Sequence, residues 1–120
     1  MAIARKGNET EGYDWFVYLI NDNEFDLYYV LITSKGYGKL DGEKRETSVL
    51  RQMFEKIDQK SYRVVESIKP ELFKLCNEFW VSYYLGREIY DKKYIFLPES
   101  LTENYLTNID LLGLEGILHY

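Results

Sequence analysis

Apolar side chains in this chain gather in short runs that turn-forming residues separate. The runs are dense in β-branched and aromatic residues or alternate with polar ones, which is typical of strands. Strands are predicted over residues 14–20, 26–33, 61–68, 79–85 and 89–97. Because short turns join these runs and no strand–helix alternation is visible, we expect antiparallel sheets.

Two pairs of runs predict hairpins. Residues 13–20 and 25–33 flank the polar turn composition of Asn21–Glu24, and the last two predicted strands are joined through Gly86–Glu88. In the first two runs apolar residues occupy both phases of the alternation. This pattern indicates strands that are covered on both sides, or an outer face rich in Tyr.

Three segments between the strands differ in character. Residues 34–45 contain three glycines and predict a loop, whereas Pro70 predicts one helical turn. Residues 47–57 are ambiguous, because Leu50 and Met53 have helical spacing while the segment also alternates like a strand. We favour a strand there, since it brings the strand count to the number customary for a sandwich.

The resulting fold class is all-β, an immunoglobulin-like antiparallel β-sandwich of about six or seven strands. The alternative is an α+β fold with residues 47–57 as a helix on one sheet. Residues 1–12 are expected to be a flexible N-terminus and residues 13–98 the sandwich domain. Residues 99–120 are too rich in Leu and Ile for a free tail, so we expect an irregular C-terminal segment packed on the domain or on a partner.

The most strongly patterned strand predicts part of the core. Trp80 lies in this strand and is expected to be largely buried. The residues expected in its layer are Val17, Leu19, Val30, Ile32, Val64, Val81 and Phe96.

Length and charge narrow the function classes. A chain of 120 residues makes one domain, and 15 basic against 20 acidic residues give a net charge of −5. This sign argues against nucleic-acid partners and against adsorption to anionic membranes. No apolar run has the length of a signal peptide or a membrane span, so we expect a cytoplasmic protein without a membrane partner.

Catalytic and metal-binding patterns are missing from the sequence. The only histidine is His119 and the only cysteine is Cys76, which we interpret as a buried thiol. A zinc site needs several such ligands, and the glycines of Gly36–Lys39 lack the spacing of a phosphate-binding loop. We therefore predict no catalytic residue, no metal and no cofactor, and we lean against an enzyme while leaving that question open.

Several motifs occur in a specific order, namely Thr33–Gly38, Thr47–Arg51, Asn77–Tyr84 and Tyr90–Ser100. Together they resemble a small uncharacterised bacterial protein family over about residues 13–112. The resemblance implies a compact domain and supplies no catalytic residues. Some members of that family carry the label phenylalanyl-tRNA synthetase alpha subunit, but a synthetase core needs a much larger domain than this chain provides.

Aromatic residues make up 17% of the chain, with 12 Tyr, which is more than one small core can absorb. Aromatic and Arg side chains are enriched at binding hot spots. A candidate interaction surface therefore consists of Tyr37, Tyr83, Arg87, Tyr90, Lys92 and Tyr94. We predict a non-enzymatic interaction module that forms a homodimer or binds an unidentified protein partner. The alternatives are a domain that binds a small ligand, sugar or nucleotide, and an accessory piece of an enzyme such as a synthetase.

Overall fold

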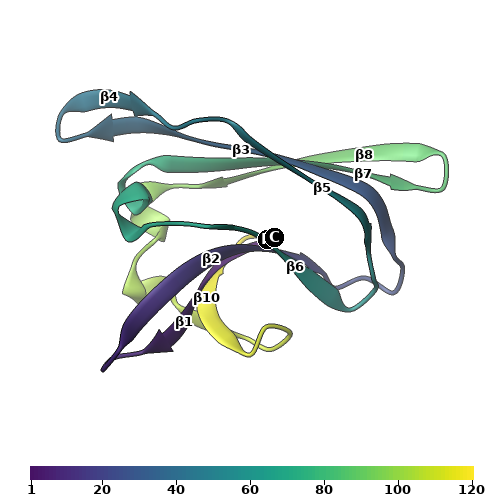
Figure 1. Cartoon of the computed structure of the whole chain (residues 1–120), viewed down its shortest axis with the longest axis horizontal. Helices are drawn as coiled ribbons and strands as arrows, with labels where there is room; N and C mark the ends of the chain where they lie inside the picture. The colour runs from purple at the N-terminus through teal and green to yellow at the C-terminus, as the bar shows by residue number, and fades with distance from the viewer.

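Two antiparallel sheets face each other in the computed structural model, which describes all 120 residues (Figure 1). In spatial order, the first sheet contains β6 (Ser61–Ser67), β2 (Gly12–Asn21), β1 (Ala2–Asn8), β10 (Leu114–Leu118) and β9 (Thr107–Ile109). The second contains β4 (Glu43–Glu46), β3 (Leu27–Leu40), β7 (Cys76–Leu85) and β8 (Glu88–Phe96), with β5 (Leu50–Ile57) also paired to β3. The all-β sandwich is confirmed, with ten strands instead of six or seven.

The connections contain three short 3-10 helices, η1 (Pro70–Lys74), η2 (Pro98–Ser100) and η3 (Glu103–Tyr105). The helical turn predicted at Pro70 is confirmed as η1. Residues 47–57 hold β5 and not a helix, because Leu50–Ile57 pairs in register with Leu27–Ser34 of β3. The pairing with β3 decides between two local patterns that the sequence leaves nearly equal.

Apolar side chains between the sheets form the main core. Six predicted members are buried there, namely Val17, Leu19, Val30, Ile32, Val81 and Phe96. The predictions for Trp80 and Val64 are wrong, since these side chains are 47% and 48% exposed. The neighbours of Trp80 in β7, Phe79 and Val81, point into the core, so the alternation of the strand turns Trp80 outward.

A second apolar cluster lies on the outer face of the first sheet. Tyr18 of β2 packs there with Ala2 and Ala4 of β1, and Phe16 and Ile20 lie against them. Val17 and Leu19 of the same strand point to the main core. The two-phase apolar pattern of β2 is thus explained by burial on both sides of the sheet.

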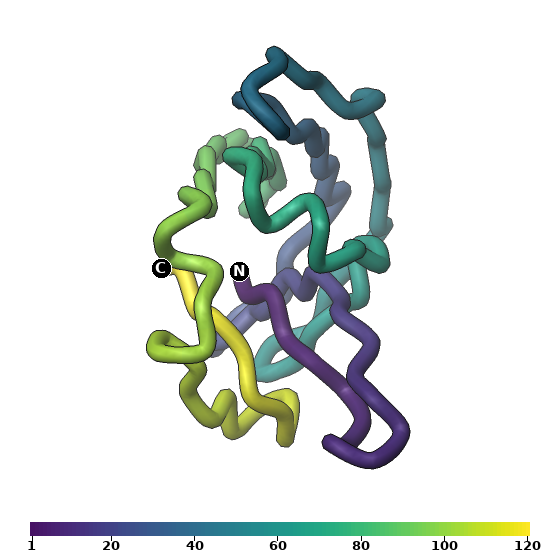
Figure 2. Tube along the Cα trace, turned by 90° about the vertical axis from the view of Figure 1, so that its left-hand side faces the viewer, coloured from purple at the N-terminus to yellow at the C-terminus, as the bar shows by residue number.

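The expectation of a flexible N-terminus is wrong. Residues 2–8 form β1, which pairs with β2 on one side and β10 on the other, and Ile3 is fully buried. Residues 99–120 contain β9 and β10, and their side chains Leu101, Ile109 and Ile117 are buried within the same domain. The chain ends lie side by side (Figure 2), because the β1–β10 pairing unites the two terminal segments.

Two predictions about turns are also wrong. The runs predicted as a first hairpin belong to different sheets, and buried Asn21 holds the crossing by donating to the carbonyls of Phe25, Ile57 and Asp58 at 2.9, 3.1 and 3.0 Å. The loop predicted at 34–45 is a hairpin, because β3 runs on to Leu40 and pairs with β4. Its turn is Asp41–Gly42, with φ of 53° and 82°, which matches the twist of a tight hairpin.

The hairpin predicted between the last two strands of the sandwich is confirmed as β7 and β8. Its register runs from Asn77 opposite Phe96 to Leu85 opposite Glu88. This hairpin forms one side of the second sheet and presents one face to the core and the other to solvent.

The neighbours Phe79 and Trp80 provide a matched test of which face of β7 is buried. Phe79→Ala should lower the free energy of unfolding by about 3–5 kcal/mol, because it removes a ring that is 2% exposed. Trp80→Ala should cost about 1 kcal/mol or less, since its ring lies at the surface. Urea unfolding of both variants measures the difference, and equal losses would contradict the assignment of the two faces.

Candidate interaction surface

The outer face of the second sheet carries a continuous set of exposed apolar side chains, which we call the aromatic face. Its members are Tyr28, Tyr29 and Leu31 of β3, Met53 of β5, Trp80 and Tyr84 of β7, and Ile89 of β8. They are neighbours across the ladder, since Leu31 pairs with both Met53 and Ser82 while Tyr84 pairs with Tyr28 and Ile89. Continuous exposed apolar patches of this kind mark interaction sites.

A β-bulge shapes one end of the aromatic face. Tyr28 pairs with Tyr84 and Leu31 pairs with Ser82, so two residues of β3 oppose the single residue Tyr83. Tyr29 within the bulge has a φ of 48°, a left-handed conformation that is costly for a bulky side chain. Bulges of this type redirect side chains, and strained backbone of this type gathers at functional sites.

The bulge creates a hollow of about 490 Å³ on the surface. Its lining consists of Tyr28, Tyr29, Met53, Tyr84 and Gly86. Tyr29 and Tyr84 meet edge to face at 6.1 Å between ring centroids, so the hollow has firm aromatic walls. Met53 is 62% exposed and supplies a flexible wall that adapts to the shape of a partner.

A second hollow, of about 540 Å³, lies beside Trp80 and is more polar. Glu78 lies between two lysines, with its carboxylate oxygens 3.8 Å from Lys35 Nζ and 3.9 Å from Lys93 Nζ. Lys93 Nζ also lies 4.8 Å from the centroid of the Trp80 ring. Asp91 adds a second acid to the lining, so this end of the aromatic face carries charges of both signs next to an aromatic ring.

The residues predicted as a surface lie on both faces of the second sheet. Tyr37 is on the outer face, where its hydroxyl donates to Glu78 at 3.5 Å. Burial, and then the negative charge of Glu78, raise the pKa of Tyr37. The other members lie elsewhere, with Arg87 in the β7–β8 turn and Tyr83, Tyr90, Lys92 and Tyr94 on the inner face.

On the inner face these side chains pack against one another, and Tyr83 and Tyr94 also pack against the main core. The rings of Tyr83 and Tyr90 stack at 5.8 Å, and Lys92 Nζ lies 4.9 Å from the centroid of Tyr94. Burial raises the pKa of Tyr94, whose ring also contacts His119. The pattern of its strand predicts Trp80 in the core, so the sequence does not predict the aromatic face. The signal that could have found it was the row Trp80, Ser82 and Tyr84 at a spacing of two.

The structure also locates the residues considered for other chemistry. Cys76 is a free, half-buried thiol, and His119 lies against Tyr94 and Phe96. No group of three His, Cys, Asp or Glu side chains is close enough together to hold a metal ion. None of the helices has the length and apolar composition that crossing a membrane would require.

The exposure of Trp80 predicts how the protein's fluorescence responds to acrylamide. In dilute solution, where the chain is a monomer, Trp80 should be quenched more strongly than Trp15, which packs edge-on against Phe73 at 5.0 Å. Trp80→Phe should therefore remove the strongly quenched component, while the control Trp15→Phe should retain it. Unchanged quenching in Trp80→Phe would contradict the exposed position of Trp80.

Comparisons with protein-family models, with curated proteins and with solved structures found no match to this chain. The resemblance to a small bacterial family therefore stays a prediction.

Proposed function

We propose that this protein is a non-enzymatic interaction module and that its aromatic face binds a second copy of the chain. The observation that carries the proposal is the set of exposed apolar side chains that extends from Met53 on β5, through the tyrosines of the shared hollow, to Ile89 on β8. Exposing Trp80, Leu31 and Tyr84 together is unfavourable for a monomer, because removing their apolar surface from water lowers the free energy.

A protein partner suits this surface better than a small ligand. Small-ligand sites enclose most of their ligand, whereas the two hollows of the aromatic face lie side by side on an open sheet. Trp, Tyr and Met are the residue types enriched at protein interfaces. These side chains surround Leu31 and would form the apolar centre of the interface. The charged side chains of Lys35, Glu78 and Lys93 would form its polar rim.

The charge pattern favours a second copy of this chain as the partner. Lys35 and Lys93 alternate with Glu78 and Asp91, so two such faces can meet with each ammonium near a carboxylate of the other copy. A two-fold dimer uses one patch twice and thereby covers both aromatic faces.

The aromatic face is preferred over the C-terminal segment as the site of association. Leu101, Ile109 and Ile117 were candidates for covering by a partner, but they are already buried in their own domain. Deleting residues 101–120 would remove β9 and β10 from the first sheet and is therefore no test of association. The exposed apolar surface that no other part of the chain covers lies on the second sheet.

Light scattering coupled to gel filtration tests the proposal. The wild-type chain should show twice its mass of 14.4 kDa at high concentration. Trp80→Glu should give the monomer mass, because it replaces a large apolar ring of the aromatic face by a carboxylate that the dimer would have to bury. The matched control is Tyr105→Glu in η3, which changes an exposed tyrosine away from the aromatic face and should leave the dimer intact.

Salt provides a further check on the same interface. Each copy carries a net charge of −5, so the copies repel each other at long range. Added salt screens this repulsion. It also screens the ion pairs at the rim, but exposed pairs contribute little, so the dimer fraction should rise. A wild-type monomer at every concentration and salt level would contradict the proposal, as would an unchanged dimer in Trp80→Glu.

A further inference from the structure

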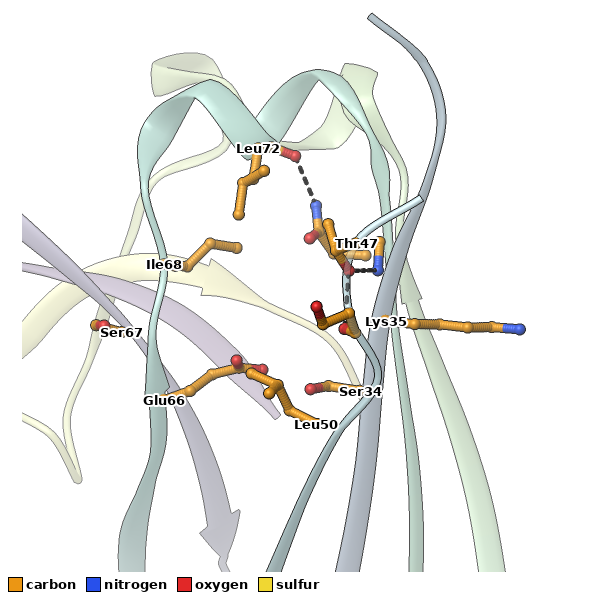
Figure 3. A pocket seen from close by; sticks show the side chains of 11 residues that line it. Ser34, Lys35, Thr47, Leu50, Glu66, Ser67, Ile68 and Leu72 are labelled. Atoms are coloured by element: carbon orange, nitrogen blue, oxygen red, sulfur yellow. Dashed lines mark hydrogen bonds between the residues drawn. The ribbon is translucent and has the colours of Figure 1, made fainter. Parts of the chain in front are cut away.

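A small niche lies between the two sheets, on the opposite side of the second sheet from the aromatic face. Its volume is about 150 Å³, enough for several water molecules or one small ion. Polar side chains from both sheets meet there, with apolar walls from Ile68 and Leu72 (Figure 3). The polar lining side chains are Ser34, Thr47, Ser48, Glu66 and Asn77. Exposed Ser48 and Ser67 lie at its mouth, so the niche is reachable from solvent.

A β-bulge in β6 places Glu66 in this niche. Tyr18 of β2 pairs with Val64, but the preceding residue Val17 pairs with Glu66, which leaves Val65 as an extra residue. Val65 and Val17 are both buried in the main core, so Glu66 also lies on the inner side of the sheet. Regular alternation would have put it outside with Val64. Bulges that redirect a side chain in this way are common beside functional sites.

The Glu66 carboxylate has no cationic partner in the protein. No lysine or arginine forms an ion pair with it, although eight ion pairs occur elsewhere in the chain. Lys35 is the only other charged residue that lines the niche, and its side chain extends away from it (Figure 3). The Lys35 ammonium lies on the outer face of the sheet, 3.8 Å from Glu78. Burial raises the pKa of Glu66, and the nearby Ser34 hydroxyl partly opposes that rise.

Two other polar side chains of the niche, Asn77 and Thr47, are engaged within the protein. Asn77 Nδ2 donates to the carbonyls of Leu72 and Leu75 at 2.9 and 3.1 Å, which holds η1 against β7. The Thr47 hydroxyl accepts from the Gly36 amide at 2.7 Å and donates to the Ser48 carbonyl at 3.2 Å. These hydrogen bonds fix the residues that line the niche. The Glu66 carboxylate is the charged group that points into it.

A structural role does not explain why this residue carries a charge. A glutamine would fill the same space without the cost of holding a carboxylate in a partly buried site. The carboxylate adds only a negative charge directed into a small cavity. From this geometry we infer that the niche binds a small organic cation, an alkylammonium or alkylguanidinium ion, with Glu66 as its counterion.

Titration with methylguanidinium and n-propylammonium chloride, followed by amide chemical shifts, tests the inference on the whole chain. Both ions should give saturable shifts at Ser34, Glu66 and Asn77. Glu66→Gln should weaken binding by about tenfold or more, since the charge-assisted contact is lost. The matched control is Glu71→Gln in exposed η1, which should leave binding unchanged. Trp80→Glu should also bind normally, which separates this test from that of the aromatic face.

Thermal unfolding without added cation gives an independent readout. Because the pKa of Glu66 is raised in the folded state, the stability it provides is present at low pH and is lost as pH rises through the folded pKa. Glu66→Gln should therefore unfold at a higher temperature than wild type at pH 7, with the difference vanishing below the unfolded pKa of the carboxyl. A lower unfolding temperature in Glu66→Gln at pH 7 would make the carboxylate structural and overturn the inference. Unsaturable shifts in the wild type, or equal shifts in Glu66→Gln, would overturn it as well.

Discussion

Contact between the inner apolar rows of the two sheets is the interaction on which the rest of this structure depends. Phe79 and Phe96 of the second sheet meet edge to face at 5.9 Å and are buried with Ile3 and Val17 of the first. Once these rows face inward, the period of two along each strand decides where the neighbouring side chains point. Trp80 is turned to solvent by the burial of Phe79, and the same pairing places Lys93 beside it.

Two β-bulges modify this simple alternation, and each produces one of the proposed sites. In β3 the bulge at Tyr29 adds a tyrosine to the outer face and opens the hollow next to Met53. In β6 the bulge at Val65 turns Glu66 inward. Both arrangements oppose stability, one through a left-handed tyrosine and the other through a partly buried carboxylate. Such local costs in an otherwise consistent fold are typical of functional positions.

The two proposed sites share the same strands but lie on opposite sides of them. Along β3, Ser34 points toward the niche while its neighbour Lys35 points to the outer face. Along β7, Asn77 and Glu78 divide in the same way. A cation in the niche and a partner on the aromatic face would therefore contact adjacent residues without touching each other. This arrangement allows the two proposed activities to be removed separately by substitution.

The sequence by itself determined the local elements. Apolar alternation identified the strands now numbered β2, β3, β6, β7 and β8, and turn composition identified the β7–β8 hairpin and the turn at Pro70. The apolar residues in both phases of β2 indicated either burial on both sides or an outer face rich in Tyr, without deciding between them. These features depend on contacts between residues close in the chain, where side-chain type and backbone preference are directly coupled.

Only the tertiary structure decided which strands pair and which side chains are exposed. The short apolar stretch Ala2–Ala4 becomes a central strand because residues 114–118, at the other end of the chain, pair with it. Composition predicts neither the exposure of Trp80 nor the position of Glu66 in the niche. The exposure of Trp80 depends on which face of β7 is buried, and the position of Glu66 depends on a one-residue shift in the register of β6. Ladder hydrogen bonds are made by the backbone, which is the same at every residue, so their register is fixed only when the facing apolar rows pack together.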